Sequence, residues 1–169
     1  RSIMLEIGRK LPNSSVLLVT ESKIETIDLM DKLVGRCVAI FGMPGAFTDT
    51  CTELHIPNIL KYKQKLLDLG VEEIFVIVVN DTFVVRRWGH SFDAFNQGIT
   101  LIADSSSEFS KAVGLNFSVP SIGFYDRSLR YAMMSRDGVV EKFLIEKSED
   151  EITTSGADAL IEAISRRST

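Results

Sequence analysis

Two short apolar runs constrain the fold of this chain most strongly: residues 36–42 read RCVAIFG, and residues 74–79 read IFVIVV. Continuous runs of this kind, rich in Val, Ile and Phe, are typical of strands that are buried on both faces of a sheet. Between them, apolar residues recur at mostly helical spacing from Leu54 to Leu69, and Gly70 then provides a good helix end. A buried strand, a helix and a second buried strand indicate an α/β fold.

The rest of the chain continues this alternation and ends differently. Further strands are predicted at residues 16–20 and 100–103, with a second strand or a short turn at residues 23–29. Further helices are predicted at residues 83–95, after the serines that follow Asp104, and at residues 157–164. The Asp137-Gly138 pair separates two β-rich runs and predicts a hairpin of residues 129–135 and 139–145. Loops are predicted at residues 114–121 and 146–155.

This order predicts a mixed central sheet with helices on both faces, because strands and helices alternate in the first part of the chain and an antiparallel hairpin of strands follows them. A thioredoxin-like fold with N-terminal additions fits the order well. The length of 169 residues is that of a single domain, residues 1–169, with a core large enough to need no disulfide staples. Four aromatic residues of the predicted 83–95 helix are expected in this core: Phe83, Trp88, Phe92 and Phe95.

The composition excludes several classes of protein. A net charge of −4, with both signs spread along the chain, argues against nucleic acid as a main partner. No apolar run approaches the roughly 18 residues that a membrane span needs, so no membrane partner is expected. The 2 cysteines form no CxxC or zinc pattern and favour a reducing compartment. Because the chain begins at Arg1, a trimmed N-terminus is expected, and the cytoplasm, a mitochondrion or a plastid all remain open.

The segment that joins the first apolar run to the first helix carries the best candidate for chemistry. Residues 41–53 read FGMPGAFTDTCTE, and Thr50 and Glu53 match a capping box, with Thr50 as the N-cap. Cys51 would then be the first helical residue, where free backbone N–H groups favour a thiolate. Pro57 lacks a backbone donor and should kink the helix just beyond this turn.

The energies show that a helix N-terminus alone does not activate a thiol. Lowering a thiol pKa from about 8.5 to about 6 requires about 3.4 kcal/mol of preference for the thiolate. A helix terminus contributes at most about 2 kcal/mol, whereas a hydrogen bond from an arginine can add about 1.5–3 kcal/mol. Asp49 would oppose ionisation of Cys51 unless its carboxylate points to solvent. From local sequence alone, a buried and inert Cys51 is an equal alternative, and Cys37 is interpreted as a small buried hydrophobe.

Residues 44–51 read PGAFTDTC and resemble the PxxxTxxC signature of the peroxiredoxins. The longer string, which continues to His55-Ile56-Pro57, resembles the type V (atypical) branch of that family. The likeness extends over nearly the whole chain. Further matches are VVNDTFV at 78–84, Trp88-Gly89, LIAD at 101–104, Gly114-Leu115, and the hairpin segments SLRYAM at 128–133 and DGVV at 137–140.

The resemblance implies a thioredoxin-fold, thiol-dependent peroxidase that reduces hydrogen peroxide and organic hydroperoxides. Cys51 matches the peroxidatic cysteine, which becomes a sulfenic acid. Thr48 matches the threonine that bonds the peroxide, and Pro44 matches the proline that shields the site. Arg130 matches the arginine that stabilises the thiolate and polarises the peroxide. It would supply the thiolate stabilisation that a helix N-terminus alone does not provide. Without the family, Pro44, Thr48 and Arg130 would be read as loop, turn and strand-end residues. His55 would be read as a packing histidine or as a group that tunes the thiolate.

One departure from the branch concerns the second step of the reaction. Many members carry a resolving cysteine before the last helix, where this chain has Ser155. Cys37 lies in a buried strand and is poorly placed to reach Cys51. We therefore expect a single-cysteine mechanism without a cofactor, in which glutathione with glutaredoxin, or thioredoxin, reduces the sulfenic acid. The family also implies a homodimer formed near the active site.

Two alternatives to the peroxidase remain at this stage. The first is a redox-sensing or chaperone-like binding module on the same fold. The second and weaker alternative is a cysteine hydrolase, for which no His/Asn pairing with Cys51 can be argued.

A further departure from the family is Asp49, where the branch often has proline, and this affects the expected reactivity of the thiol.

Overall fold

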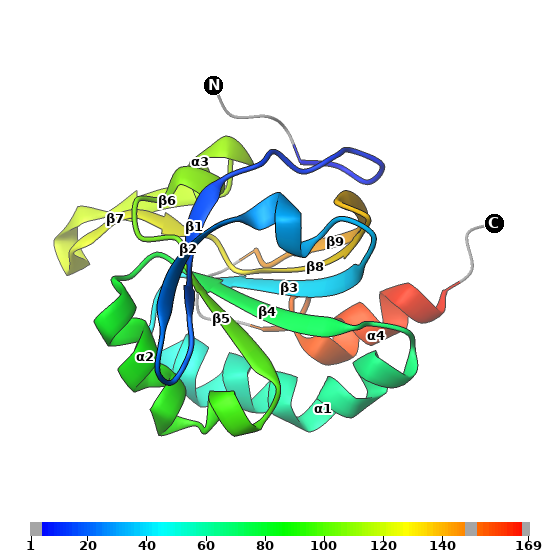
Figure 1. The fold of residues 1–169 in the computed structure, drawn as a ribbon, viewed down its shortest axis with the longest axis horizontal. Coiled ribbons are helices and arrows are strands. Elements are labelled where there is room, and N and C mark those ends of the chain that lie inside the picture. The colour runs from blue at the N-terminus through cyan, green and yellow to red at the C-terminus, as the bar shows by residue number, and fades with distance from the viewer. Residues whose placement is uncertain (1–4, 148–151, 167–169) are drawn as a thin grey trace.

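The computed structural model describes residues 5–147 and 152–166 of the chain. Within these residues, the centre of the molecule is a mixed seven-stranded sheet of order β2-β1-β5-β4-β3-β8-β9 (Figure 1). Its strands are β1 Ser15–Val19, β2 Ile24–Asp28, β3 Cys37–Met43, β4 Glu73–Val78, β5 Ile99–Ala103, β8 Tyr131–Arg136 and β9 Val139–Ile145. The two apolar runs of the sequence form β3 and β4, which lie side by side and parallel near the middle of the sheet.

The pairing of the other strands makes the sheet mixed, as the order of elements predicts. β4 also pairs with β5 in parallel, whereas β1 pairs with β5, and β8 with β3, in antiparallel fashion. The predicted hairpin is formed by β8 and β9. Its turn has positive φ at both Asp137 (52°) and Gly138 (75°), the backbone that the Asp-Gly pair favours in tight hairpins.

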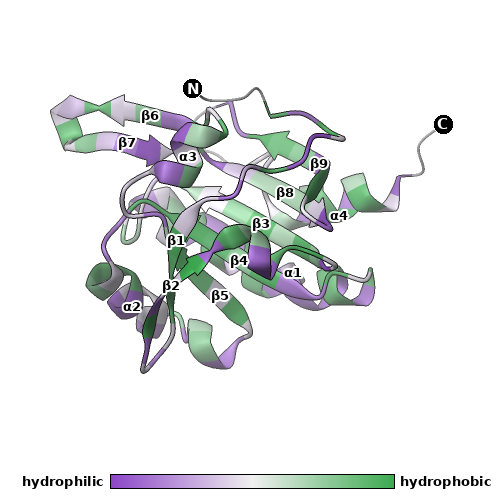
Figure 2. Cartoon of the chain, turned by 45° about the horizontal axis from the view of Figure 1, so that its top comes forward, coloured by the Kyte–Doolittle hydropathy of each residue, from purple (hydrophilic) through white to green (hydrophobic). Residues whose placement is uncertain are grey.

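Helices cover both faces of the sheet. The helices α1 Ile56–Asp68, α2 Thr82–Ser91 and α4 Ala157–Ser165 pack on one face, and α3 Glu108–Ala112 with the N-terminal segment packs on the other (Figure 1). Successive residues of β3 alternate between these layers: Phe41 packs with the first group and Ile40 with the second. Figure 2 shows the resulting concentration of apolar residues on the central strands.

A second, two-stranded sheet replaces a predicted loop. β6 Asn116–Val119 and β7 Phe124–Ser128 pair in antiparallel fashion, joined by the 3-10 turn Pro120–Ile122 and by Gly123 at φ 76°. The pair lies beside α3 at the edge of the molecule (Figure 1). The loop prediction for residues 114–121 is therefore wrong, because the proline and glycine mark the turn of a hairpin.

The predicted aromatic helix is shorter than expected. α2 ends at Ser91, and a separate 3-10 turn, Ala94–Asn96, follows Asp93 at a φ of 58°. Trp88 is fully buried, and Phe92 and Phe95 pack against the same core. Phe83, however, is 74% exposed, so its placement in the core was wrong. Of the loop predicted at residues 146–155, residues 148–151 lie outside the described part of the chain.

No helix in the described residues is both long enough and apolar enough to cross a membrane.

Candidate active site

The helix that carries Cys51 begins two residues earlier than the sequence predicts. The chain is helical from Asp49, and the carbonyl of Thr48 accepts a hydrogen bond from the Thr52 N–H at 2.9 Å. Thr50 has helical φ and ψ (−64°, −39°), and its side chain makes no capping hydrogen bond, so its prediction as the N-cap is wrong. The first-turn position of Cys51 is nevertheless retained, and its N–H belongs to the donors that have no carbonyl partner inside a helix.

The helix departs from regular α-helical geometry at the cysteine. Cys51–His55 form a single π-helical turn, in which the Ile56 N–H bonds to the Cys51 carbonyl five residues earlier. Pro57, within the first turn of α1, has no N–H to continue the regular pattern. The irregularity expected near Pro57 therefore lies on its N-terminal side, in the turn that holds the thiol.

A guanidinium lies against the sulfur. Arg130 Nη2 donates to Cys51 Sγ at 3.2 Å, and both side chains are buried, with exposed fractions of 2% and 0%. Arg130 directly precedes β8, and β8 pairs with β3, whose C-terminal end leads into the Cys51 loop. Sheet pairing thus brings together two residues that are 79 positions apart in the sequence.

The same guanidinium also contacts a buried histidine. Arg130 Nη1 and His55 Nδ1 are 3.0 Å apart, and His55 Nε2 is 2.9 Å from the carbonyl oxygen of Ser155. Burial and then the charge of Arg130 lower the pKa of His55 from 6.5 to about 3, so the ring is neutral near pH 7. The edge of the ring also meets Phe41, with centroids 5.7 Å apart. His55 thus both packs in the core and contacts the group that binds the thiol.

The loop before the helix is fixed by two residues that the sequence did not indicate as site residues. Arg127 Nη1 donates to the Pro44 carbonyl at 3.1 Å, and the Ala46 N–H donates to Asn80 Oδ1 at 2.8 Å. A Cβ at Gly45 would overlap the Arg127 guanidinium, so a larger residue there would displace the end of this side chain. Asn80 could have been found, because it follows β4 at the edge of the sheet where β3 also ends. Arg127 could not, because it lies on the unpredicted β7.

A cavity of about 430 Å³ opens beside Arg130, the residue that contacts the sulfur, whereas the fully buried Cys51 does not itself line the cavity. Its polar side includes three of the predicted site residues, Pro44, Thr48 and Arg130, together with Asp49 and Thr50. Its apolar side comes from the second sheet and its turn: Phe117, Val119, Ile122 and Phe124. Thr48 Oγ1 donates to the Gly45 carbonyl at 2.7 Å, so the lone pairs of its oxygen remain available as acceptors. Asp49 is exposed to solvent, which weakens its effect on Cys51.

Comparison with known proteins assigns the family. The family model described as Redoxin matches residues 6–161 of the chain. Peroxiredoxin-2B from Arabidopsis thaliana is 32% identical over 95% of this chain and 98% of its own length. The chain belongs to the peroxiredoxins of the Redoxin family. It is therefore a thiol-dependent peroxidase, and its likeness to type V members is supported by the relatives below.

Further relatives of this peroxiredoxin agree in sequence and in fold. The hybrid peroxiredoxin hyPrx5 of Haemophilus influenzae is 33% identical over 91% of the chain, which spans only 64% of that longer protein. The structure of reduced Prx3 from Vibrio vulnificus in complex with H₂O₂ superposes with a TM-score of 0.87, at 32% identity over 95% of this chain and 96% of that one. Peroxiredoxin 5 from Alvinella pompejana superposes with a TM-score of 0.84, at 28% identity over 96% and 99% of the two chains. These neighbours confirm the thioredoxin-like peroxiredoxin fold.

The second cysteine of the peroxiredoxin lies away from the cavity. Cys37 begins β3, whereas the Cys51 loop follows the end of that strand, and six residue steps of a strand span about 20 Å. Burial raises the pKa of the Cys37 thiol, with the nearby Arg136 acting in the opposite direction. Cys37 is 4% exposed, as expected for a small buried hydrophobe. Among the described residues, no cluster of three or more His, Cys, Asp or Glu side chains could hold a metal ion.

Proposed function

We propose that this peroxiredoxin reduces hydrogen peroxide and organic hydroperoxides with Cys51 as its single peroxidatic cysteine. The observation that carries the proposal is the 3.2 Å contact between Arg130 Nη2 and Cys51 Sγ beside the cavity. A charge-assisted hydrogen bond of this kind contributes about 1.5–3 kcal/mol in favour of the thiolate. The arginine is thus the second source of thiolate stabilisation, in addition to the helix N-terminus.

The groups around the cavity suggest how the peroxide is held. The thiolate of Cys51 attacks the terminal oxygen of ROOH, the O–O bond breaks, and the products are a sulfenic acid and RO⁻, which takes up a proton to give ROH. Thr48 donates its own hydroxyl hydrogen to Gly45, so it would accept a hydrogen bond from the peroxide O–H. Arg130 and the Cys51 N–H would donate to the peroxide oxygens, and Pro44 would shield the site from water.

The sulfenic acid is then reduced by an external thiol in this proposal. Ser155 cannot form a disulfide, and Cys37 lies at the far end of β3 from the Cys51 loop. An incoming thiol RSH would form a mixed disulfide with Cys51 and release water, and a second thiol would regenerate Cys51. Glutathione with glutaredoxin is the first candidate reductant and thioredoxin the second, and no bound cofactor enters the cycle.

We further propose a homodimer and a reducing compartment. Three exposed apolar side chains support a contact on this part of the surface: Phe47 in the loop before Cys51, Phe83 on α2 and Ile122 at the cavity. The two free, buried cysteines are compatible with the cytoplasm or with a mitochondrion or plastid.

Stopped-flow oxidation of three proteins tests the assignment of Cys51. Cys51→Ser is expected to abolish peroxide consumption, whereas Cys37→Ser should retain nearly the wild-type rate. Mass spectrometry of the peroxide-treated protein with glutathione should then show one adduct, on Cys51. A disulfide between residues 37 and 51 would contradict the external reductant. A slow second-order reaction of the wild-type protein would favour a redox-sensing module instead.

A further inference from the structure

A buried carboxylate organises the segment that reaches the active-site histidine. Glu146 follows β9, and its N–H donates to the carbonyl of Arg130 at 2.9 Å, so it lies beside Arg130 just beyond the ends of β9 and β8. Its carboxylate accepts four hydrogen bonds from residues 153–155. The donors are Thr153 Oγ1 (2.8 Å), the Thr154 N–H (3.0 Å), the Ser155 N–H (2.9 Å) and Ser155 Oγ (2.7 Å).

The bonds beyond Ser155 have a fixed direction. An arginine side chain has donors and no acceptor, so Arg130 Nη1 must donate to His55 Nδ1. The neutral ring of His55 then carries its hydrogen on Nε2 and donates to the Ser155 carbonyl. The position of that carbonyl therefore fixes the tautomer and the orientation of the ring. The ring in turn fixes one arm of the guanidinium whose other arm binds Cys51.

Burial limits how far water can replace these bonds. His55 and Ser155 have no exposed surface, and Glu146 is 7% exposed. Burial acts to raise the pKa of the Glu146 carboxyl, but the hydrogen bonds from Ser155, Thr153 and Thr154 outweigh it and lower the pKa. Glu146 is consequently ionised and remains a strong acceptor at neutral pH.

We propose that Glu146 is a positioning residue for Arg130, acting through the backbone of Ser155 and the ring of His55. It touches neither Cys51 nor the cavity, but it holds the carbonyl that orients the histidine, and thereby the guanidinium on the sulfur. The inference rests on the proposed roles of Cys51 and Arg130. It also gives Ser155 a function in this chain: its hydroxyl ties it to Glu146 while its carbonyl binds His55.

The test compares two substitutions of Glu146 in two backgrounds. Glu146→Met removes all four acceptors, whereas Glu146→Gln can keep its carbonyl oxygen towards Thr154 and Ser155 and its amide towards the Thr153 hydroxyl. Each is made in the wild-type chain and together with Arg130→Met. Glu141→Met is the matched control, because Glu141 lies on β9 and forms an exposed bridge with Arg136. Two rate constants are measured, oxidation of Cys51 by hydrogen peroxide and its alkylation by iodoacetamide.

We expect Glu146→Met to slow both reactions of Cys51 by about tenfold or more, the effect of one charge-assisted hydrogen bond. Glu146→Gln should recover most of the rate, and Glu141→Met should match the wild type. In the Arg130→Met background, Glu146→Met should have no further effect, because its action passes through the guanidinium. A merely structural contribution would instead slow both backgrounds by the same factor, and that result would overturn the proposal. Equal losses for the Gln and Met variants would also overturn it.

Two further measurements keep the test decisive. If Glu146→Met does not fold, as judged by circular dichroism, Ser155→Ala replaces it, since it removes one bond to Glu146 and keeps the backbone carbonyl. A smaller slowing that disappears in the Arg130→Met background supports the positioning role, and an equal slowing in both backgrounds contradicts it. If the wild-type chain does not consume peroxide, the proposed function fails. The alkylation rates still decide whether Glu146 acts on the sulfur through Arg130.

Discussion

The side chain of His55 gives the molecule a specific dependence on pH. Its pKa is lowered from 6.5 to about 3, first by burial and then by the charge of Arg130. Between these two values the unfolded chain binds a proton on this histidine and the folded chain does not. The folded state is therefore favoured as pH rises through this window and disfavoured as pH falls, by up to about 1.4 kcal/mol per pH unit.

Replacing His55 should remove this contribution. We expect the free energy of unfolding of the wild-type chain to fall by about 2 kcal/mol more than that of His55→Asn when the pH is lowered from 7.5 to 5. Urea unfolding at a series of pH values measures the difference. His90→Asn is the matched control, because His90 is the other histidine of the chain and is exposed. If His55→Asn kept the pH slope of the wild type while His90→Asn lost it, the buried neutral state of His55 would be wrong.

The sequence predicted the need for a cation beside the thiol better than it predicted the local backbone. Comparison of energies showed that a helix N-terminus is too weak alone, and the structure places Arg130 at 3.2 Å from the sulfur. Thr50 and Glu53 match the sequence pattern of a capping box, but Thr50 makes no capping hydrogen bond. The helix had already begun at residue 49, and the Thr48 hydroxyl bonds back to Gly45 instead of capping it. The residue at which this helix begins depends on the preceding loop, which Arg127 and Asn80 hold in place.

Among the elements, the β6–β7 pair shows what a sequence pattern cannot predict. Its strands are short, their burial is irregular, and Pro120 and Gly123 between them read as loop residues. A two-stranded sheet is only marginally stable alone, so its existence depends on contacts elsewhere. Two of these are the hydrogen bonds that Ser107 Oγ donates to the Asp126 carbonyl, at 2.6 Å, and that Arg127 Nη1 donates to the Pro44 carbonyl, at 3.1 Å.

This pair of strands should favour peroxides with an apolar tail. Phe117 lines the same cavity as Thr48 and Arg130 and packs in a T-shaped contact with Phe124. Phe117→Ala should therefore lower the rate constant for cumene hydroperoxide roughly tenfold, the scale of losing apolar contact with a substrate. Hydrogen peroxide has no tail to contact this wall, so its rate constant should change by less than about twofold, within the usual scatter of surface substitutions. Stopped-flow oxidation with each peroxide gives both values.

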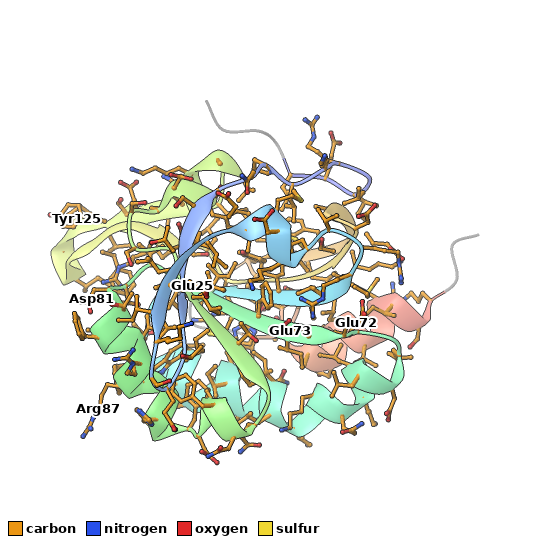
Figure 3. The ribbon with its side chains drawn as sticks, viewed as in Figure 1. Glu25, Glu72, Glu73, Asp81, Arg87 and Tyr125 are labelled. Carbon is orange, nitrogen blue, oxygen red and sulfur yellow. The ribbon has the colours of Figure 1, made fainter. Side chains whose placement is uncertain are left out.

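Tyr125→Ala is the control for this prediction. Tyr125 lies on β7, the strand that pairs with the β6 strand of Phe117, but it is 64% exposed, and Figure 3 shows its side chain projecting outward from the molecule. Both rate constants of this variant should equal those of the wild type. If Phe117→Ala slowed the two peroxides equally, the wall would act on the shape of the site rather than on the substrate tail.

At the scale of the whole molecule, the sheet brings Cys51 and Arg130 together. β3 leads into Cys51, β8 follows Arg130, and the two strands are antiparallel neighbours with Gly42 opposite Tyr131. The sequence predicts both strands and the mixed character of the sheet, since burial on both faces and the Asp-Gly turn are local patterns. It does not predict that β8 lies beside β3, because two strands of the main sheet (β4 and β5) and three helices (α1, α2 and α3) come between them in the chain. From the sequence, only the family resemblance connects Arg130 with Cys51.

The last prediction concerns the surface around the loop that joins β3 to Cys51. A single charged substitution there should dissociate the proposed dimer. Phe47, Phe83 and Ile122 are 51%, 74% and 64% exposed. Phe47 borders the same depression as Arg87 of α2, and Ile122 borders the cavity with Thr48. Figure 3 shows Arg87 and Tyr125 pointing outward on this side of the molecule. Phe83 lies one helical turn before Arg87 on α2. We propose that a second copy covers these exposed apolar side chains.

Phe83→Glu should separate the two copies, because an unpaired carboxylate buried in an apolar interface costs several kcal/mol. Sedimentation velocity should give twice the mass of one chain for the wild type and the mass of a single chain for the variant. Val34→Glu is the matched control: Val34 is 55% exposed and lies just before β3, at the end of the strand away from the active-site loop. A Phe83→Glu protein that remained dimeric would move the interface elsewhere, whereas dissociation of the Val34→Glu protein would place it at the opposite end of β3.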